Sequence, residues 1–220
     1  MKRDEVCELI KRIGILPSVR VHSRDLASFA AETLYSSGIP IVEITMTTPG
    51  ALEVIADMAR RHEDLAVGAG TVLDDEIARR CVDAGARFIT SPGFIPEVVA
   101  YSKKMGIAAL PGALTPTEVI AAWKAGADFV KIFPTGQVGG VQYVRALKVP
   151  LPQIPLIATG GVNQLTASDF IIAGAAAIGM GGELLPREAL HLRQEDRIRE
   201  LAGRFLGMVR DARVLRETYY

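Results

Sequence analysis

The chain has 220 residues, of which 49% are hydrophobic, and equal numbers of acidic and basic side chains give it no formal net charge. This length and apolar content predict one sizeable globular domain over residues 1–220. The absence of net charge and of a basic run argues against nucleic acid as a partner, and no apolar run is long enough to span a membrane.

The cysteines and histidines predict neither a disulfide nor a metal centre. Cys7 and Cys81 lie in unrelated helical-looking segments, as expected for reduced thiols in a cytoplasmic protein. The N-terminus begins with a mixed-charge helical pattern rather than the apolar core of a signal peptide. His22, His62 and His191 are far apart and show no paired ligand spacing, so we predict no metal site.

Short apolar runs alternate with helical patterns along the whole chain. Runs rich in β-branched residues recur every 20 to 27 residues, and the segments between them carry apolar residues at three- and four-residue spacing. Residues 2–13 and 187–216 are predicted to be helices outside these units. The eight predicted strands are Ile15–Val21, Ile39–Ile44, Ala66–Ala69, Phe88–Ser91, Ile107–Leu110, Phe129–Phe133, Pro155–Ala158 and Ala176–Met180.

The helical patterns end in similar glycine-containing punctuation, at Gly38, Gly85, Gly126 and Gly174. A glycine at this position lets the chain turn from a helix into the next strand. Alternating strands and helices require a parallel sheet covered by helices. Eight such units predict an α/β fold, a (β/α)8 TIM barrel with an extra N-terminal helix. An open, doubly wound sheet is the alternative.

Lys131 is the most informative residue of the sixth strand. It lies inside an apolar strand-like run, whereas the other six lysines lie in polar or helical-looking segments. Burial disfavours the charged ammonium, and a neutral amine can attack a carbonyl carbon to form a Schiff base. The alternative is a lysine whose charged end reaches solvent past the end of the strand.

Glu43 is the only carboxylate inside an apolar strand near the C-terminal end of that strand. Its strand is the second and that of Lys131 the sixth, so in a barrel of eight the two face each other and share the same layers. An amine and a carboxylate at an otherwise apolar mouth predict a nucleophile and an acid–base group. A structural buried ion pair is the alternative.

Two glycine doublets follow the seventh and eighth strands, where barrels often bind phosphate. Gly160-Gly161 and Gly181-Gly182 would let backbone N–H groups approach an anion, although tight turns also use glycine. Glu183 follows directly, and its carboxylate would repel a phosphate unless it points away.

Arg20 and Thr71, at the ends of the first and third strands, are candidate ligands for a substrate carboxylate. Arginine offers a two-pronged donor matched to a carboxylate, and threonine offers a hydroxyl. Solvated strand ends are the alternative interpretation of both.

Six motifs occur in a fixed order at these strand ends: Val42-Glu43-Ile44-Thr45, Val67-Gly68-Ala69-Gly70-Thr71-Val72, Ser91-Pro92-Gly93, Leu110-Pro111-Gly112, Val130-Lys131-Ile132-Phe133-Pro134 and Thr159-Gly160-Gly161-Val162. With them, about the whole chain resembles the KDPG/KHG aldolases, which act on 2-keto-3-deoxy-6-phosphogluconate and 4-hydroxy-2-oxoglutarate. The order and spacing of the motifs carry the resemblance.

The resemblance implies a homotrimeric class I aldolase without metal or cofactor, which releases pyruvate from a small-molecule 2-keto acid. The aldehyde product would be glyceraldehyde 3-phosphate or glyoxylate. By resemblance, Lys131 forms the Schiff base, Glu43 is the general acid/base, Arg20 and Thr71 hold the carboxylate, Pro92 and Phe133 line the pocket, Thr159 contacts substrate, and Gly160, Gly161, Gly181 and Gly182 take the phosphate.

Two positions depart from the family pattern. Thr47 stands where some relatives carry arginine, and Arg20 is predicted to replace that cation. Gly182 and Glu183 stand where a serine usually meets phosphate, so an unphosphorylated substrate and loss of activity stay open. Further alternatives are an aldolase for 2-keto-3-deoxy-6-phosphogalactonate, a phosphate-binding barrel isomerase without an imine, and a binding or structural protein.

Overall fold

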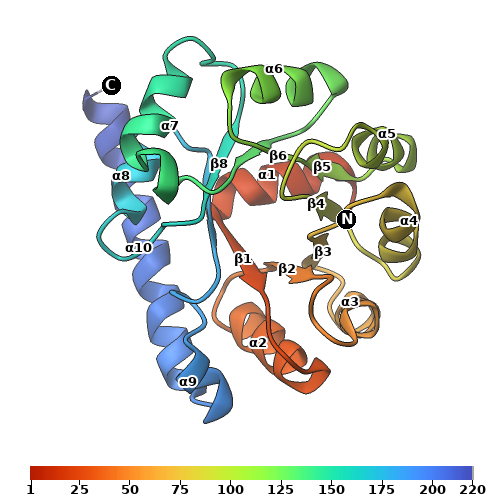
Figure 1. Ribbon diagram of the computed structural model, residues 1–220. Helices are drawn as coiled ribbons and strands as arrows, with labels where there is room; N and C mark the ends of the chain where they lie inside the picture. Colours follow the sequence, from red (N-terminus) through yellow and green to blue (C-terminus); the bar gives the residue numbers. More distant parts are fainter. Residues whose placement is uncertain (220) are drawn as a thin grey trace.

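The computed structural model describes residues 1–219, in which nine parallel strand segments form one sheet curled into a barrel (Figure 1). Their order around the sheet is β5-β4-β3-β2-β1-β9-β8-β7-β6. The strands are β1 (Ile15–Val19), β2 (Ile41–Thr45), β3 (Ala66–Gly70), β4 (Phe88–Thr90), β5 (Ala108–Leu110), β6 (Gly112–Ala113), β7 (Val130–Ile132), β8 (Leu156–Thr159) and β9 (Ala177–Met180).

β5 and β6 are two parts of one strand that is interrupted at Pro111. β5 pairs with β4, and β6 pairs with β7, so the chain at Pro111 joins the two ends of the sheet. Pro111 has no N–H to donate to the sheet, but its carbonyl oxygen still accepts from the Lys131 N–H at 2.9 Å. The eight-unit barrel is therefore confirmed, with the fifth predicted strand continued beyond a proline.

The helices surround the sheet, as expected where parallel strands are buried on both faces. The predicted helix-end glycines, Gly38, Gly85, Gly126 and Gly174, all have positive φ angles. No helix within residues 1–219 has the length and apolar character needed to cross a membrane. The helices are α1 (Arg3–Ile13), α2 (Arg24–Ser36), α3 (Ala51–Arg61), α4 (Asp75–Asp83), α5 (Pro96–Met105), α6 (Pro116–Ala125), the 3-10 turn η1 (Gly136–Val138), α7 (Val141–Lys148), α8 (Ala167–Ile172), α9 (Arg187–His191) and α10 (Glu195–Tyr219).

The C-terminal helix α10 is part of the ring of helices. It packs against α8 and α2 and also contacts β1, closing the gap between the last and first units (Figure 1). The prediction that residues 187–216 lie outside the eight units is therefore wrong. Ile198, Ala202, Phe205, Val209 and Ala212 are buried at alternating spacings of four and three residues, which gives α10 one apolar face toward the barrel.

The N-terminal helix α1 is an addition to the barrel, as predicted. It contacts β1, β5 and β9, and its buried side chains are Val6, Leu9, Ile10 and Ile13. The helix ends at Gly14, whose φ of 72° turns the chain directly into β1. Because α1 contacts the end of the barrel from which β1 starts, the C-terminal ends of the strands remain free to form a site.

Candidate active site

Glu43 of β2 and Lys131 of β7 meet inside the mouth of the barrel. The Lys131 Nζ lies 3.7 Å from Glu43 Oε2. Only 2% of Glu43 and 8% of Lys131 is exposed, so water screens this ion pair poorly. The structure thus brings together the two residues that strand parity predicts to face each other.

Two hydroxyl groups that the sequence analysis missed hold the Glu43 carboxylate. Ser18 Oγ donates to Oε1 at 2.9 Å, and Thr90 Oγ1 donates to Oε2 at 2.8 Å. Hydrogen bonds to an ionised acceptor are the stronger kind and fix the orientation of the carboxylate. Both residues are polar interruptions near the ends of the apolar strands β1 and β4, which is the signal that could have identified them.

Gly70 provides the space that the Glu43 carboxylate occupies. A Cβ atom on Gly70, at the end of β3, would lie 2.0 Å from Glu43 Oε1, far inside van der Waals contact. Gly70 is paired with Thr45 in the register between β3 and β2, so neither strand can shift alone. The absence of a side chain at this position therefore determines where the carboxylate lies.

We expect Gly70→Ala to lower the free energy of unfolding by about 1–3 kcal/mol, because the added methyl group overpacks the site. Gly93→Ala is the matched control, since a Cβ there would meet nothing within 4 Å. Denaturant unfolding of both variants measures the difference. In a Glu43→Ala background the cost of Gly70→Ala should largely disappear, and a full cost there would contradict the assigned contact.

Arg20 lies across the ends of β1, β2 and β3. Its Nη1 donates to Thr47 Oγ1 and its Nη2 to Thr71 Oγ1, each at 3.1 Å. Thr71 has a φ of 60°, a conformation that is uncommon for a β-branched residue and costs about 1–3 kcal/mol. Such strain is typical of functional sites, which favours a role for Thr71 beyond capping a strand.

Arg20, Thr71 and Lys131 border a cavity of about 1150 Å³ at the C-terminal ends of the strands. The Lys131 Nζ lies 5.7 Å from the centroid of the Phe133 ring, within the range of a cation–π contact. The cavity is large enough for a ligand well beyond the size of a three-carbon acid. Its lining includes every predicted site residue except Glu43, namely Arg20, Thr71, Pro92, Lys131, Phe133, Thr159, Gly160, Gly161, Gly181 and Gly182.

Thr159 and the glycine doublets form one wall of the cavity. The Thr159 Oγ1 atom is buried and has no hydrogen-bond partner within residues 1–219, which is rare for a buried hydroxyl and marks a place for a ligand atom or water. The neighbouring loop has a fixed shape, because the carbonyl oxygen of Gly160 accepts from Thr135 Oγ1 at 2.6 Å and from the Gly136 N–H at 2.8 Å. In the part of the chain described, the N–H of Gly161 donates to no protein acceptor.

The outer end of the cavity carries charged and imidazole side chains that the sequence analysis did not connect. His22 follows β1, Glu183 follows β9, and α9 contributes Arg187 and His191. The His22 and His191 ring centroids are 5.0 Å apart. No local spacing links residues so distant in sequence, since only closure of the barrel between β1 and β9 brings them together.

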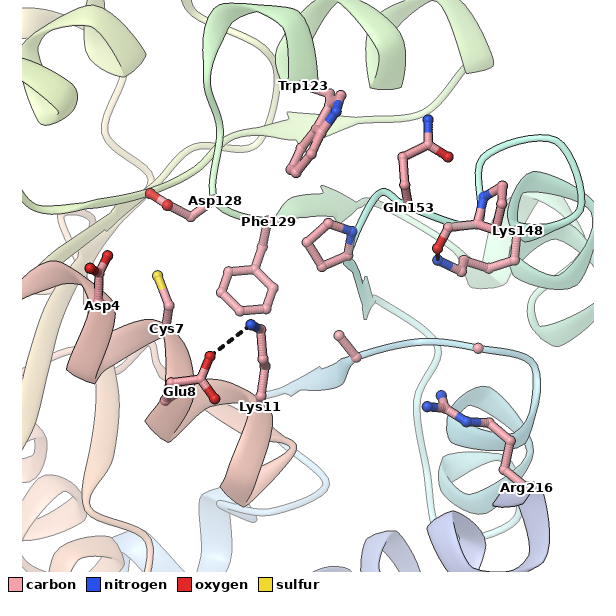
Figure 2. Close-up of a pocket in the computed structure, with 14 residues that line it drawn as sticks. Asp4, Cys7, Glu8, Lys11, Trp123, Asp128, Phe129, Lys148, Gln153 and Arg216 are labelled. Carbon is pink, nitrogen blue, oxygen red and sulfur yellow. Dashed lines mark hydrogen bonds and ion pairs between the residues drawn. The ribbon is translucent and has the colours of Figure 1, made fainter. Parts of the chain in front are cut away.

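A second cavity, of about 510 Å³, lies at the opposite end of the barrel (Figure 2). It is bordered by α1 and by residues that precede β7, β8 and β9, such as Asp128 and Ala176. Its two lysines already have protein partners. Lys11 bonds Glu8 at 2.8 Å, and Lys148 Nζ donates to the carbonyl oxygens of Pro152 and Ile154, each at 2.8 Å.

Among the lysines and cysteines that the structure describes, only Lys131 lines the large cavity. Burial raises the pKa of Cys7 to about 12 and that of Cys81 to about 12, so both thiols are protonated at neutral pH. Burial lowers the pKa of Lys148, but its amine is engaged by carbonyl oxygens at the other end of the barrel. Lys131 Nζ donates no hydrogen bond to any residue that the structure describes.

Two sequence comparisons both identify aldolases as similar proteins. The sequence model for KDPG and KHG aldolase matches residues 6–201. The 2-dehydro-3-deoxy-phosphogluconate aldolase of Treponema pallidum (strain Nichols) is 31% identical over 205 residues, covering 93% of this chain and 97% of the relative.

Two solved structures resemble the whole barrel. The KDPG aldolase of Legionella pneumophila, with pyruvate captured at low pH as a covalent carbinolamine intermediate, is 28% identical, has a TM-score of 0.83, and aligns over 89% of this chain and 95% of its own. A cube-shaped, highly porous cage designed by fusing symmetric oligomeric domains is 29% identical, with a TM-score of 0.85, and aligns over 94% of this chain and 75% of its own.

Proposed function

The chain belongs to the KDPG and KHG aldolase family, as its motifs predict, and from this premise we propose that Lys131 is the Schiff-base residue of its aldolase reaction. The observation that carries the proposal is a buried amine, free of hydrogen bonds to the described residues, 3.7 Å from the buried carboxylate of Glu43. The carbinolamine captured with pyruvate in the Legionella pneumophila relative supports the same chemistry.

The proposed reaction is reversible cleavage of a 2-keto-4-hydroxy acid into pyruvate and an aldehyde. Lys131 attacks the C2 ketone, and loss of water leaves an iminium that accepts electrons. Glu43 takes up the proton of the C4 hydroxyl as the C3–C4 bond breaks, which yields an enamine on Lys131. Protonation at C3 and hydrolysis then release pyruvate and restore the free amine.

The experiment that tests this proposal is reduction with borohydride in the presence of pyruvate, followed by mass spectrometry of the intact chain and its peptides. An adduct on Lys131 is expected. If folded protein gave no adduct, the imine would be excluded and a phosphate-binding isomerase of the same fold would become the better explanation.

Arg20 and Thr71 are proposed to bind the carboxylate of the keto acid. The Arg20 guanidinium donates to Thr47, where some relatives carry their own arginine, so the cation would come from the residue after β1 instead of from the loop after β2. The hydroxyls of Thr47 and Thr71 hold its two terminal nitrogens, which orients the planar group beside the cavity.

We expect Arg20→Met to raise the KM for the keto acid by about 10- to 100-fold, the effect of losing hydrogen bonds to a charged group. The change in kcat should be smaller, because the carboxylate is bound in both the ground and the transition state. Arg24→Met, which alters a nearby arginine outside the cavity lining, is the matched control for steady-state kinetics. An unchanged KM in Arg20→Met would place the carboxylate elsewhere.

The substrate we propose is 2-keto-3-deoxy-6-phosphogluconate, with 4-hydroxy-2-oxoglutarate as a second, smaller substrate. The cavity volume of about 1150 Å³ and the glycine doublets after β8 and β9 support a long, anionic substrate. Glu183 works against phosphate binding because its carboxylate lines the same cavity. Comparing kcat/KM for the two compounds measures the contribution of the phosphate.

We expect Glu183→Gln to lower the KM for the phosphorylated substrate about threefold, because one repulsive charge is removed at a solvent-exposed position. The KM for 4-hydroxy-2-oxoglutarate should stay constant. Glu188→Gln removes an exposed carboxylate of α9 that pairs with Arg197 and is the control. Equal changes for both substrates would show that Glu183 does not lie beside the phosphate.

We propose that the enzyme is a cytoplasmic homotrimer. The resemblance to a chain from a cage built of symmetric oligomeric domains supports self-association, and two free cysteines within the described residues fit a reducing compartment. Light scattering coupled to gel filtration should give three times the chain mass of 23.6 kDa.

A further inference from the structure

The Glu43 carboxylate is separated from the substrate cavity by a serine. Ser18 belongs to the lining of the cavity that the described residues form, and Glu43 does not. Only 2% of Glu43 is exposed. Ser18 Oγ lies 2.9 Å from Glu43 Oε1, so one hydroxyl contacts both the cavity and the buried carboxylate. A direct proton transfer from substrate to Glu43 would have to displace this contact.

We propose that Ser18 is a catalytic residue that carries the proton between Glu43 and the substrate, a role that rests on the proposed aldolase function. An ionised carboxylate only accepts hydrogen bonds, so the Ser18 hydroxyl directs its hydrogen at Oε1 and its lone pairs elsewhere. Those lone pairs are free to accept a hydrogen bond from the C4 hydroxyl of a bound substrate.

The proton balance of the step is complete within these groups. During cleavage, the C4 hydroxyl gives its proton to Ser18 Oγ while the proton of Ser18 moves to Glu43 Oε1. The electrons of the O–H bond form the new C4 carbonyl, and those of the C3–C4 bond neutralise the iminium. In the next step Ser18 donates its proton to C3 of the enamine and receives one from Glu43, which returns both residues to their starting states.

Thr90 provides an internal comparison for this role. Its hydroxyl donates to the other carboxylate oxygen of Glu43 at 2.8 Å, but Thr90 is fully buried and does not line the cavity within the described chain. Ser18 and Thr90 therefore both position Glu43, and only Ser18 can also reach a substrate. Substituting each in turn separates proton transfer from positioning.

The test is exchange of the pyruvate methyl protons in D2O, followed by NMR, together with borohydride trapping. Exchange needs the imine and proton transfer at C3 but no aldehyde. Ser18→Ala should slow exchange about 100-fold, within the usual contribution of a general acid–base group, and leave the Lys131 adduct intact. Thr90→Val should slow exchange only a few-fold, and Ser18→Thr, which keeps a hydroxyl, should recover most of the rate.

Three outcomes would overturn the proposal in distinguishable ways. Normal exchange in Ser18→Ala with an intact adduct would remove Ser18 from the proton path and leave the aldolase function standing. Equal losses in Ser18→Ala and Thr90→Val would reduce Ser18 to a positioning residue. Absence of a pyruvate adduct in the unaltered enzyme would instead refute the Schiff-base function on which the proposal rests.

Discussion

Replacing Lys131 with methionine should abolish borohydride trapping of pyruvate and lower kcat on the order of 10⁵-fold, as expected when a covalent catalyst is removed. Methionine has a similar length and suits the burial of this position, which is only 8% exposed. The mass of the reduced protein reports the loss of imine directly, and steady-state kinetics report the loss of turnover.

Lys148→Met is the matched control for this experiment. Burial lowers the pKa of Lys148, so on titration behaviour alone this lysine could be mistaken for the nucleophile. Its amine is bound by carbonyl oxygens in the cavity at the opposite end of the barrel (Figure 2), so trapping and kcat should persist. A residual adduct in Lys131→Met that disappears in Lys148→Met would contradict the assignment.

Folding of the Lys131→Met variant needs a separate measurement. The substitution leaves the Glu43 carboxylate buried without its cation, which typically destabilises a protein by about 3–5 kcal/mol. Ser18 and Thr90 still donate to the carboxylate, so we expect a loss at the lower end of this range. Thermal unfolding followed by circular dichroism shows whether lost activity reflects chemistry or lost structure.

Replacing Glu43 with glutamine should separate imine formation from bond cleavage. The amide retains the shape of the side chain but cannot take up a proton, so kcat should fall about 10²- to 10⁴-fold. The pyruvate adduct on Lys131 should still form. One of the hydroxyls of Ser18 and Thr90 must rotate, because the amide nitrogen cannot accept its hydrogen bond.

Glu53→Gln is the control for Glu43→Gln, since Glu53 is an exposed carboxylate in the first turn of α3. It should leave kcat unchanged. Normal turnover in Glu43→Gln would show that another group moves the proton. Loss of the adduct together with turnover would show that Glu43 is needed for attack on the ketone and not only for cleavage.

The barrel and the Glu43–Lys131 pair could be predicted because the sequence patterns that indicate them are local or follow from the symmetry of the barrel. Apolar runs and helix-end glycines mark the units, and strand parity places Glu43 opposite Lys131 once eight units are counted. Strand parity does not show which neighbouring side chains contact the Glu43 carboxylate. Ser18 and Thr90 are found only when strand register and rotamers are known.

The outer end of the cavity could not be predicted for a different reason. His22 and His191 become neighbours through the pairing of β1 with β9. The sequence around one histidine does not indicate that the other lies nearby. The role of α10 was missed although its apolar residues alternate at four- and three-residue spacing. That spacing predicts a helix with one buried face, but not the surface on which the face packs.

Closure of the barrel through β1 and β9 also has a consequence for biosynthesis. β1 ends at Val19 and β9 begins at Ala177, so one edge of β1 stays unpaired until nearly the whole chain has been translated. At ribosomal speeds of about 5–20 residues per second, this edge is exposed for roughly ten seconds or more. An unpaired apolar strand edge is a template for aggregation, so the nascent chain is exposed to this hazard until β9 emerges.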